Sequence, residues 1–243
     1  MGGIWFEATA GLLAGIAIWE CMQISDKAGA PSYSIFSWVI ALLLFASFAM
    51  PVEFVAGWVF ILLFITTWFL ISKNEERFRR WSSTLFCGMY APFGFVMLVQ
   101  IRRLGMETDG FWLALALLLM IWGNDVFAYF GGKSFGKRKL APTVSPNKTW
   151  EGFWSGFIGA VVGLGIAWVI ADPFPVSLLL MLPAAVLVSI FGPIGDLTES
   201  RLKRIAGVKD SSSILPGHGG VFDRFDALIL TAPFLFFYFY LVI

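Results

Sequence analysis

Residues that could carry out chemistry gather in two polar segments of a chain that is otherwise strongly apolar. The longer segment, residues 192–226, holds acidic and basic side chains at helical spacing. Positions i, i+4, i+7 and i+8 lie on one face of a helix, and here they are Asp196, Ser200, Lys203 and Arg204. Asp223 and Asp226 follow at i and i+3, which also share a face. Because carboxylate oxygens ligate hard cations such as Mg2+, the segment predicts a magnesium site beside cations that could hold phosphate.

A glycine-rich stretch lies between these two acidic positions. Gly217, Gly219 and Gly220 surround His218, the only histidine in the chain. Glycine lets the backbone approach a ligand closely because it has no Cβ atom. A lone histidine is often structural, but this glycine-rich setting favours a functional role.

The shorter segment, residues 131–152, combines glycines and two prolines with basic side chains. Flexible backbone amides and cations together suit a polyphosphate ligand. The basic residues are Lys133, Lys137, Arg138, Lys139 and Lys148. An ordinary cytoplasmic loop of a membrane protein would also carry such cations, so the pattern alone leaves both interpretations open.

The amino-acid composition indicates whether this chain lies in water or in a lipid bilayer. Of its 243 residues, 58% are hydrophobic and 14% are charged, and the mean hydropathy is +0.81. A soluble domain carries about 25% charged residues. The net charge of +1 gives no general attraction to nucleic acid, so we expect none as a partner. The chain is predicted to lie in a lipid bilayer.

Apolar runs of about 20 residues predict membrane-spanning helices. There are eight: residues 5–24, 33–50, 52–71, 82–101, 111–130, 153–171, 175–191 and 226–243. The predicted fold is therefore an all-α, polytopic integral membrane helical bundle with about eight transmembrane helices. Residues 1–110 would form spans one to four, and residues 111–243 a catalytic region with two cytoplasmic loops. Small residues in the sixth span predict close helix packing: Gly156, Gly159, Gly163 and Gly165.

The distribution of lysine and arginine predicts the orientation. With these spans, the first, third, fifth and seventh connections hold 15 of the 17 basic residues. Basic loops face the cytoplasm, so both termini are expected outside. Asn124, Asp125 and Glu151 then lie at the same cytoplasmic depth as the carboxylates of residues 192–226, beside both basic loops. Glu20, near the inner end of the first span, is expected to be a structural residue or a minor polar contact.

Residues 200–226 resemble the signature of CDP-diacylglycerol synthases, also called phosphatidate cytidylyltransferases. The resemblance lies in Ser200-Arg-Leu-Lys-Arg204, Lys209-Asp210, Leu215-Pro-Gly-His-Gly-Gly220 and Asp223-Arg-Phe-Asp226. Gly195-Asp-Leu197, Asn124-Asp125 with Ala128-Tyr129, and Ser145-Pro-Asn-Lys-Thr-Trp-Glu-Gly152 also look like this family. The first 110 residues are similar only in hydropathy, and the chain looks short at its N-terminus for the family.

The resemblance implies that CTP and phosphatidate give CDP-diacylglycerol and pyrophosphate, in a prokaryotic inner or plasma membrane with the active site facing the cytoplasm. It implies Mg2+ as cofactor, held by Asp196, Asp223 and Asp226 with Asp125 as a weaker candidate. A second divalent or monovalent cation and a homodimer stay open. The implied catalytic residues are Asp196, Lys203, Lys209, His218, Asp223 and Asp226, with His218 contacting a phosphate or the leaving group. Substrate binding would fall to Lys133, Lys137, Arg138, Lys139, Asn147, Lys148, Ser200, Arg204, Gly219, Gly220 and Arg224.

Two other functions compete with this interpretation. A CTP-dependent kinase of a lipid alcohol, such as a polyprenol or phytol, would use the same topology and nucleotide but transfer the γ-phosphoryl group. The complete signature and the number of cations argue against it. A transporter would place its polar residues along a path at the middle of the membrane, whereas here they gather at one face.

Overall fold

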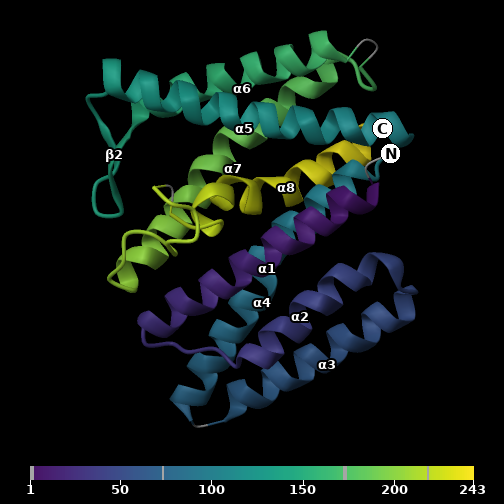
Figure 1. The fold of residues 1–243 in the computed structure, drawn as a ribbon, viewed down its shortest axis with the longest axis vertical. Helices are drawn as coiled ribbons and strands as arrows, with labels where there is room; N and C mark the ends of the chain where they lie inside the picture. The colour runs from purple at the N-terminus through teal and green to yellow at the C-terminus, as the bar shows by residue number, and fades with distance from the viewer. Residues whose placement is uncertain (1–2, 73, 172–173, 218) are drawn as a thin grey trace. The chain divides into compact units, whose positions relative to one another are not determined.

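The computed structural model describes residues 3–72, 74–171, 174–217 and 219–243. Within these residues the chain is almost entirely helical, and its helices follow one another along the chain as Figure 1 shows. They are α1 (Gly3–Lys27), α2 (Ser34–Ala46) with the short 3-10 turn η1 (Ser47–Ala49), α3 (Val52–Ile71), α4 (Glu75–Arg102), α5 (Glu107–Phe135), α6 (Trp150–Ile170), α7 (Leu178–Ile205) and α8 (Phe222–Val242).

These helices confirm the predicted all-α membrane bundle, with one correction to the second span. Seven described helices are long and apolar enough to cross a membrane, and α2 is not one of them. Its 13 residues rise only about 20 Å at 1.5 Å per residue, against a hydrocarbon core of about 30 Å.

Two helices continue well beyond the apolar runs that predicted them. The seventh run ends at residue 191, but α7 extends to Ile205. Asp196 is therefore inside a helix and not beyond its end, and it shares that helix with Ser200, Lys203 and Arg204 as their spacing predicted. The fifth run ends at residue 130, whereas α5 extends to Phe135. Hydropathy marks only the lipid-facing length of a helix, and the polar turns after it are equally helical.

A small antiparallel hairpin, which the sequence pattern did not predict, joins α5 to α6. It consists of β1 (Lys139–Ala141) and β2 (Ser145–Thr149). The backbone N–H of Trp150 donates to the carbonyl of Arg138 and so closes the base of the hairpin. The basic segment 131–152 is thus an ordered element, and β2 leads directly into the first turn of α6.

The chain forms two compact units. Unit 1 contains the residues up to Ala10, Met97–Arg201 and Arg224–Ile243, and unit 2 contains Gly11–Val96 and Leu202–Asp223. Residues 202–223 belong with the N-terminal helices, although much of the family signature lies in them.

In unit 1, α5 and α6 pack backbone against backbone and lie side by side in Figure 1. A Cβ atom at Gly159 would overlap the carbonyl of Gly123, and one at Gly163 would overlap that of Leu119. Small residues let helices approach this closely in lipid, so the predicted packing role holds for these two glycines. It does not hold for Gly165, where an added Cβ would meet nothing within 4 Å.

In unit 2, an aromatic cluster packs around Trp81, whose exposed fraction is 2%. Its ring stacks on Phe69 with centroids 5.1 Å apart, and its Nε1 donates to the hydroxyl of Thr66 at 3.0 Å. The two cysteines, Cys21 and Cys87, are free thiols buried in the same unit.

Candidate active site

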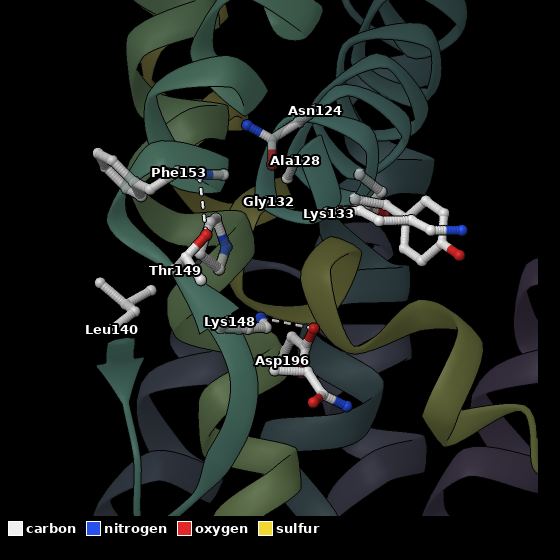
Figure 2. A pocket seen from close by; sticks show the side chains of 14 residues that line it. Asn124, Ala128, Gly132, Lys133, Leu140, Lys148, Thr149, Phe153 and Asp196 are labelled. Atoms are coloured by element: carbon white, nitrogen blue, oxygen red, sulfur yellow. Dashed lines mark hydrogen bonds and ion pairs between the residues drawn. The ribbon is translucent and has the colours of Figure 1, made fainter. Parts of the chain in front are cut away.

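A cavity of about 470 Å³ opens in unit 1 where α5, the hairpin, α6 and α7 meet. Polar and apolar residues both line its walls, and Figure 2 shows the labelled ones on these elements. The polar residues on the walls are Asn124, Asp125, Tyr129, Lys133, Asn147, Lys148, Thr149 and Asp196. A cavity of this size suits a small ligand.

Local hydrogen bonds fix the hairpin over the start of α6. Thr149 caps α6, because its hydroxyl accepts from the N–H of Gly152 at 3.1 Å. The carboxylate of Glu151 accepts from the backbone N–H groups of Lys137 and Arg138 at 3.0 and 3.1 Å. An acidic residue in the first turn of a helix is favoured by the helix dipole. This order leaves Lys148, at the end of β2, on the cavity wall.

Lys148 and Asp196 form an ion pair across this cavity. The Nζ atom of Lys148 lies 2.6 Å from Oδ2 of Asp196, and the side chains are 24% and 38% exposed. Figure 2 shows the two side chains pointing toward each other. The hydroxyl of Ser200, one turn along α7, donates to the other carboxylate oxygen of Asp196 at 3.2 Å. The structure thus brings together three residues that the sequence placed in two separate loops.

Asp226 belongs to the same part of unit 1. A Cβ atom at Gly195 would overlap the backbone carbonyl of Asp226, so α7 and α8 are in close contact there. Asp125, Asp196 and Asp226 are within electrostatic reach of one another, and Lys148 attracts both Asp125 and Asp226. Three acidic side chains therefore share the cavity region with Lys148.

The donor set fits a magnesium ion shared with a phosphate ligand. In the described part of the chain, no three histidine, cysteine or acidic side chains are grouped closely enough to hold a metal by themselves. Mg2+ in phosphate-handling sites keeps several waters and takes only one or two carboxylates, together with oxygens of the substrate. Asp125 and Asp196 on the cavity wall are such carboxylates.

Asn124 is a candidate binding residue that the predicted site did not include. Its exposed fraction is 2%, it lines the cavity, and its Nδ2 has no hydrogen-bond partner among the described residues. A buried amide without a partner costs free energy, and a ligand in the cavity could supply the missing acceptor. The sequence signal was the Asn124-Asp125 pair inside an apolar run.

In unit 2, Asp223 is the centre of a second polar network. Its Oδ1 lies 2.6 Å from Nζ of Lys203, and the two side chains are only 8% and 13% exposed. Its Oδ2 accepts from the backbone N–H groups of Ser211 and Gly220 at 2.9 and 2.7 Å, and the hydroxyl of Ser211 lies 2.9 Å away. The predicted ligands thus fall into two groups, with Asp223 bound to Lys203 and to the α7–α8 loop (residues 206–217 and 219–221).

The other predicted site residues have varied positions. Lys133 and Asn147 line the cavity, and Lys133 also lies over the ring of Tyr129. Gly219 has a φ of +79°, a conformation that suits glycine. His218 lies outside the described residues. Six further predicted cations are exposed and do not line the cavity: Lys137, Arg138, Lys139, Arg204, Lys209 and Arg224.

Comparison with known proteins places these features in one family. Residues 1–242 match the profile of the Cytidylyltransferase family. This chain is a member of the cytidylyltransferase family. The match covers both the cavity of unit 1 and the Asp223 network of unit 2, and it also includes the N-terminal helices, for which the sequence offered only hydropathy.

Three bacterial relatives of this cytidylyltransferase family member are named phosphatidate cytidylyltransferase. The Pseudomonas aeruginosa protein is 35% identical over 241 residues, which cover 95% of this chain and 86% of the relative. The Staphylococcus saprophyticus protein is 37% identical over 97% of this chain and 81% of the relative. The Bacillus subtilis protein is 40% identical over 178 residues, 73% of this chain, and the match spans 65% of that relative's length.

Proposed function

We propose that this chain transfers the cytidylyl group of CTP to phosphatidate, giving CDP-diacylglycerol and pyrophosphate in a membrane. The relatives that carry the name phosphatidate cytidylyltransferase support this activity. The structural observation that supports this activity most directly is the Lys148–Asp196 ion pair. It connects the polar segments 131–152 and 192–226 at one polar cavity.

The reaction needs charge stabilisation more than proton transfer. A phosphate oxygen of phosphatidate attacks the α-phosphorus of CTP, and the bond from that phosphorus to the bridging oxygen of the β-phosphate breaks. The nucleophile is already ionised at neutral pH, so no strong general base is required. Because both reactants are polyanions, fixed cations that neutralise their charge supply most of the rate enhancement.

In this proposal the unit 1 cavity binds the triphosphate of CTP. Lys133 and Lys148 contribute positive charge, and Asn124 and Asn147 contribute amide donors and acceptors. Lys148 would exchange part of its contact with Asp196 for a phosphate oxygen when the nucleotide binds. Asp196 then keeps the hydrogen bond from Ser200, which holds its carboxylate in place.

We further propose that the activity requires Mg2+. Asp125 and Asp196 would hold the ion on the cavity wall, and Asp226 would be a third carboxyl group nearby. When bound, the ion would draw negative charge away from the phosphates of CTP. The residues of the chain orient the two polyanions, and Lys148 offsets the repulsion between acidic side chains and substrate.

We also propose that the hairpin and the α7–α8 loop face the cytoplasm, where CTP is available. This orientation does not depend on α2: α5, α6, α7 and α8 alternate across the membrane, so the ten basic residues of segments 133–148 and 201–224 lie on the side opposite to Arg102 and Arg103. The apolar helices support the membrane setting.

The deciding experiment uses purified protein in detergent with phosphatidate, Mg2+ and CTP labelled at either the α or the γ position. We expect lipid-bound label only from the α position, with release of pyrophosphate. Lipid labelled from the γ position, with CDP as co-product, would instead assign the chain as a CTP-dependent lipid kinase. Asp196→Asn and Lys148→Met should each lose the α-label transfer, whereas Lys27→Met, an exposed lysine at the end of α1, should not.

A further inference from the structure

The first helix supplies a buried acid to unit 2. Glu20 lies on α1, and its exposed fraction is 0%. An ionisable side chain buried at membrane depth is costly and marks a functional position unless its partners explain it. Among the described residues, the hydrogen-bond partners of Glu20 lie in the α7–α8 loop and at the start of α8, about 200 residues later in the chain.

Four donors from the described part of the chain bind this carboxylate. Two are backbone N–H groups at the beginning of α8: Val221 donates to Oε1 at 3.1 Å and Phe222 to Oε2 at 2.6 Å. Two are hydroxyls of the loop: Ser212 donates to Oε1 at 2.5 Å and Ser211 to Oε2 at 3.1 Å. The first N–H groups of a helix have no acceptors within the helix. At the start of α8, the carboxylate of Glu20 is the acceptor for two of these N–H groups.

The hydroxyl of Ser211 links Glu20 to Asp223. It lies 3.1 Å from Glu20 and 2.9 Å from Asp223, and a hydroxyl has one proton to donate. Gly220 lies between the same groups. Its N–H donates to Asp223, and a Cβ atom added to it would overlap both Ser211 Oγ and Glu20 Oε1. The two carboxylates therefore hold the same short stretch of backbone from two sides.

We propose that Glu20 is a positioning residue for the reaction: it fixes the first turn of α8 and the α7–α8 loop, and thereby the direction of Asp223 and Lys203, two residues to which the family resemblance gives a catalytic role. The proposal rests on the proposed function. Glu20 does not touch substrate in it, and its effect passes through the backbone of residues 211–222. It gives the N-terminal region a defined part in the reaction, which hydropathy alone did not indicate.

The informative variant is Glu20→Gln, which keeps the shape but replaces one acceptor oxygen with an NH2 group facing backbone donors. We expect kcat per folded molecule to fall at least tenfold, with the KM for CTP changed less than threefold. Amide hydrogen exchange in residues 211–222 should speed up at least tenfold and stay unchanged in α5 and α6. Glu20→Asp keeps both acceptors and should lose less kcat than Glu20→Gln; a role in packing volume alone would reverse that order.

Glu7→Gln is the matched control, because Glu7 lies on the same helix but is only half-buried, with a side chain 36% exposed, and is paired with Arg103. It should leave kcat and exchange unchanged. Folded Glu20→Gln protein with kcat within twofold of the parent would overturn the proposal. If Glu20→Gln does not fold, Ser212→Ala decides: a threefold or greater loss of kcat supports the proposal, and an unchanged kcat overturns it. If the parent protein makes no CDP-diacylglycerol, the proposed function fails, and the exchange measurement alone tests whether Glu20 orders the loop.

Discussion

Replacing Lys203 with methionine should destabilise the protein far more than the same change at Lys148. Both lysines make ion pairs of 2.6 Å, but the pairs differ in burial. The side chains of Lys203 and Asp223 are 13% and 8% exposed, whereas those of Lys148 and Asp196 are 24% and 38% exposed. Water and counter-ions can replace a lost partner only where they reach the remaining charge.

The two costs can be estimated from that difference. Removing one partner of a buried ion pair costs about 3–5 kcal/mol. We expect about 3 kcal/mol for Lys203→Met, the low end of that range, because Ser211 and Gly220 still donate to Asp223. An exposed pair contributes about 0–1 kcal/mol. For a chain of this size, these values correspond to Tm losses of roughly 6–12 °C for Lys203→Met and at most about 4 °C for Lys148→Met.

Thermal unfolding in detergent, followed by a thiol-independent fluorescence or circular dichroism signal, measures the Tm of each variant. Turnover of labelled CTP measures its activity. Lys148→Met should lose at most about 4 °C in Tm and still lose about 100-fold in turnover, or about 2.7 kcal/mol of transition-state stabilisation. Lys27→Met should keep both. Equal Tm losses in Lys203→Met and Lys148→Met would refute the argument from burial.

Three further predictions test packing, metal dependence and topology. Gly159→Ala should sharply reduce the yield and Tm of folded protein, because its Cβ would overlap the α5 backbone, while Gly165→Ala should be tolerated. Excess EDTA should abolish turnover and added Mg2+ should restore it, whereas full turnover in chelator would remove the proposed metal. In intact cells, a membrane-impermeant maleimide should label Met106→Cys but not Ser134→Cys, both exposed positions of the parent; the opposite pattern would invert the orientation.

Hydropathy and spacing predicted much of this molecule. Apolar runs located every long helix, because a helix in lipid must be apolar along its whole spanning length. The second run gave only a 13-residue α-helix that passes into the 3-10 turn Ser47–Ala49, and residue counts do not reveal such a change of helix type. The helical spacing of Asp196, Ser200 and Lys203 was confirmed when α7 proved to extend through them.

The hairpin between α5 and α6 could not be read from the sequence in the same way. Residues 139–149 are polar and contain prolines, and two short strands leave no clear alternation. Their order depends on Glu151 and Thr149, whose side chains accept backbone N–H groups of the hairpin and of α6. Asn124 was likewise visible as a polar residue in an apolar run, but its unpartnered amide became evident only in the cavity.

By itself, the sequence determined the membrane setting, the helices and the family signature, because each depends on residue types at short separations. Tertiary structure alone decided which charges meet. Lys148 pairs with Asp196, Lys203 with Asp223, and Glu20 receives donors from a loop 191 and 192 residues away. Hydropathy gives the depth of a side chain in the bilayer but not its neighbours, since those depend on which helices pack together and at what rotation.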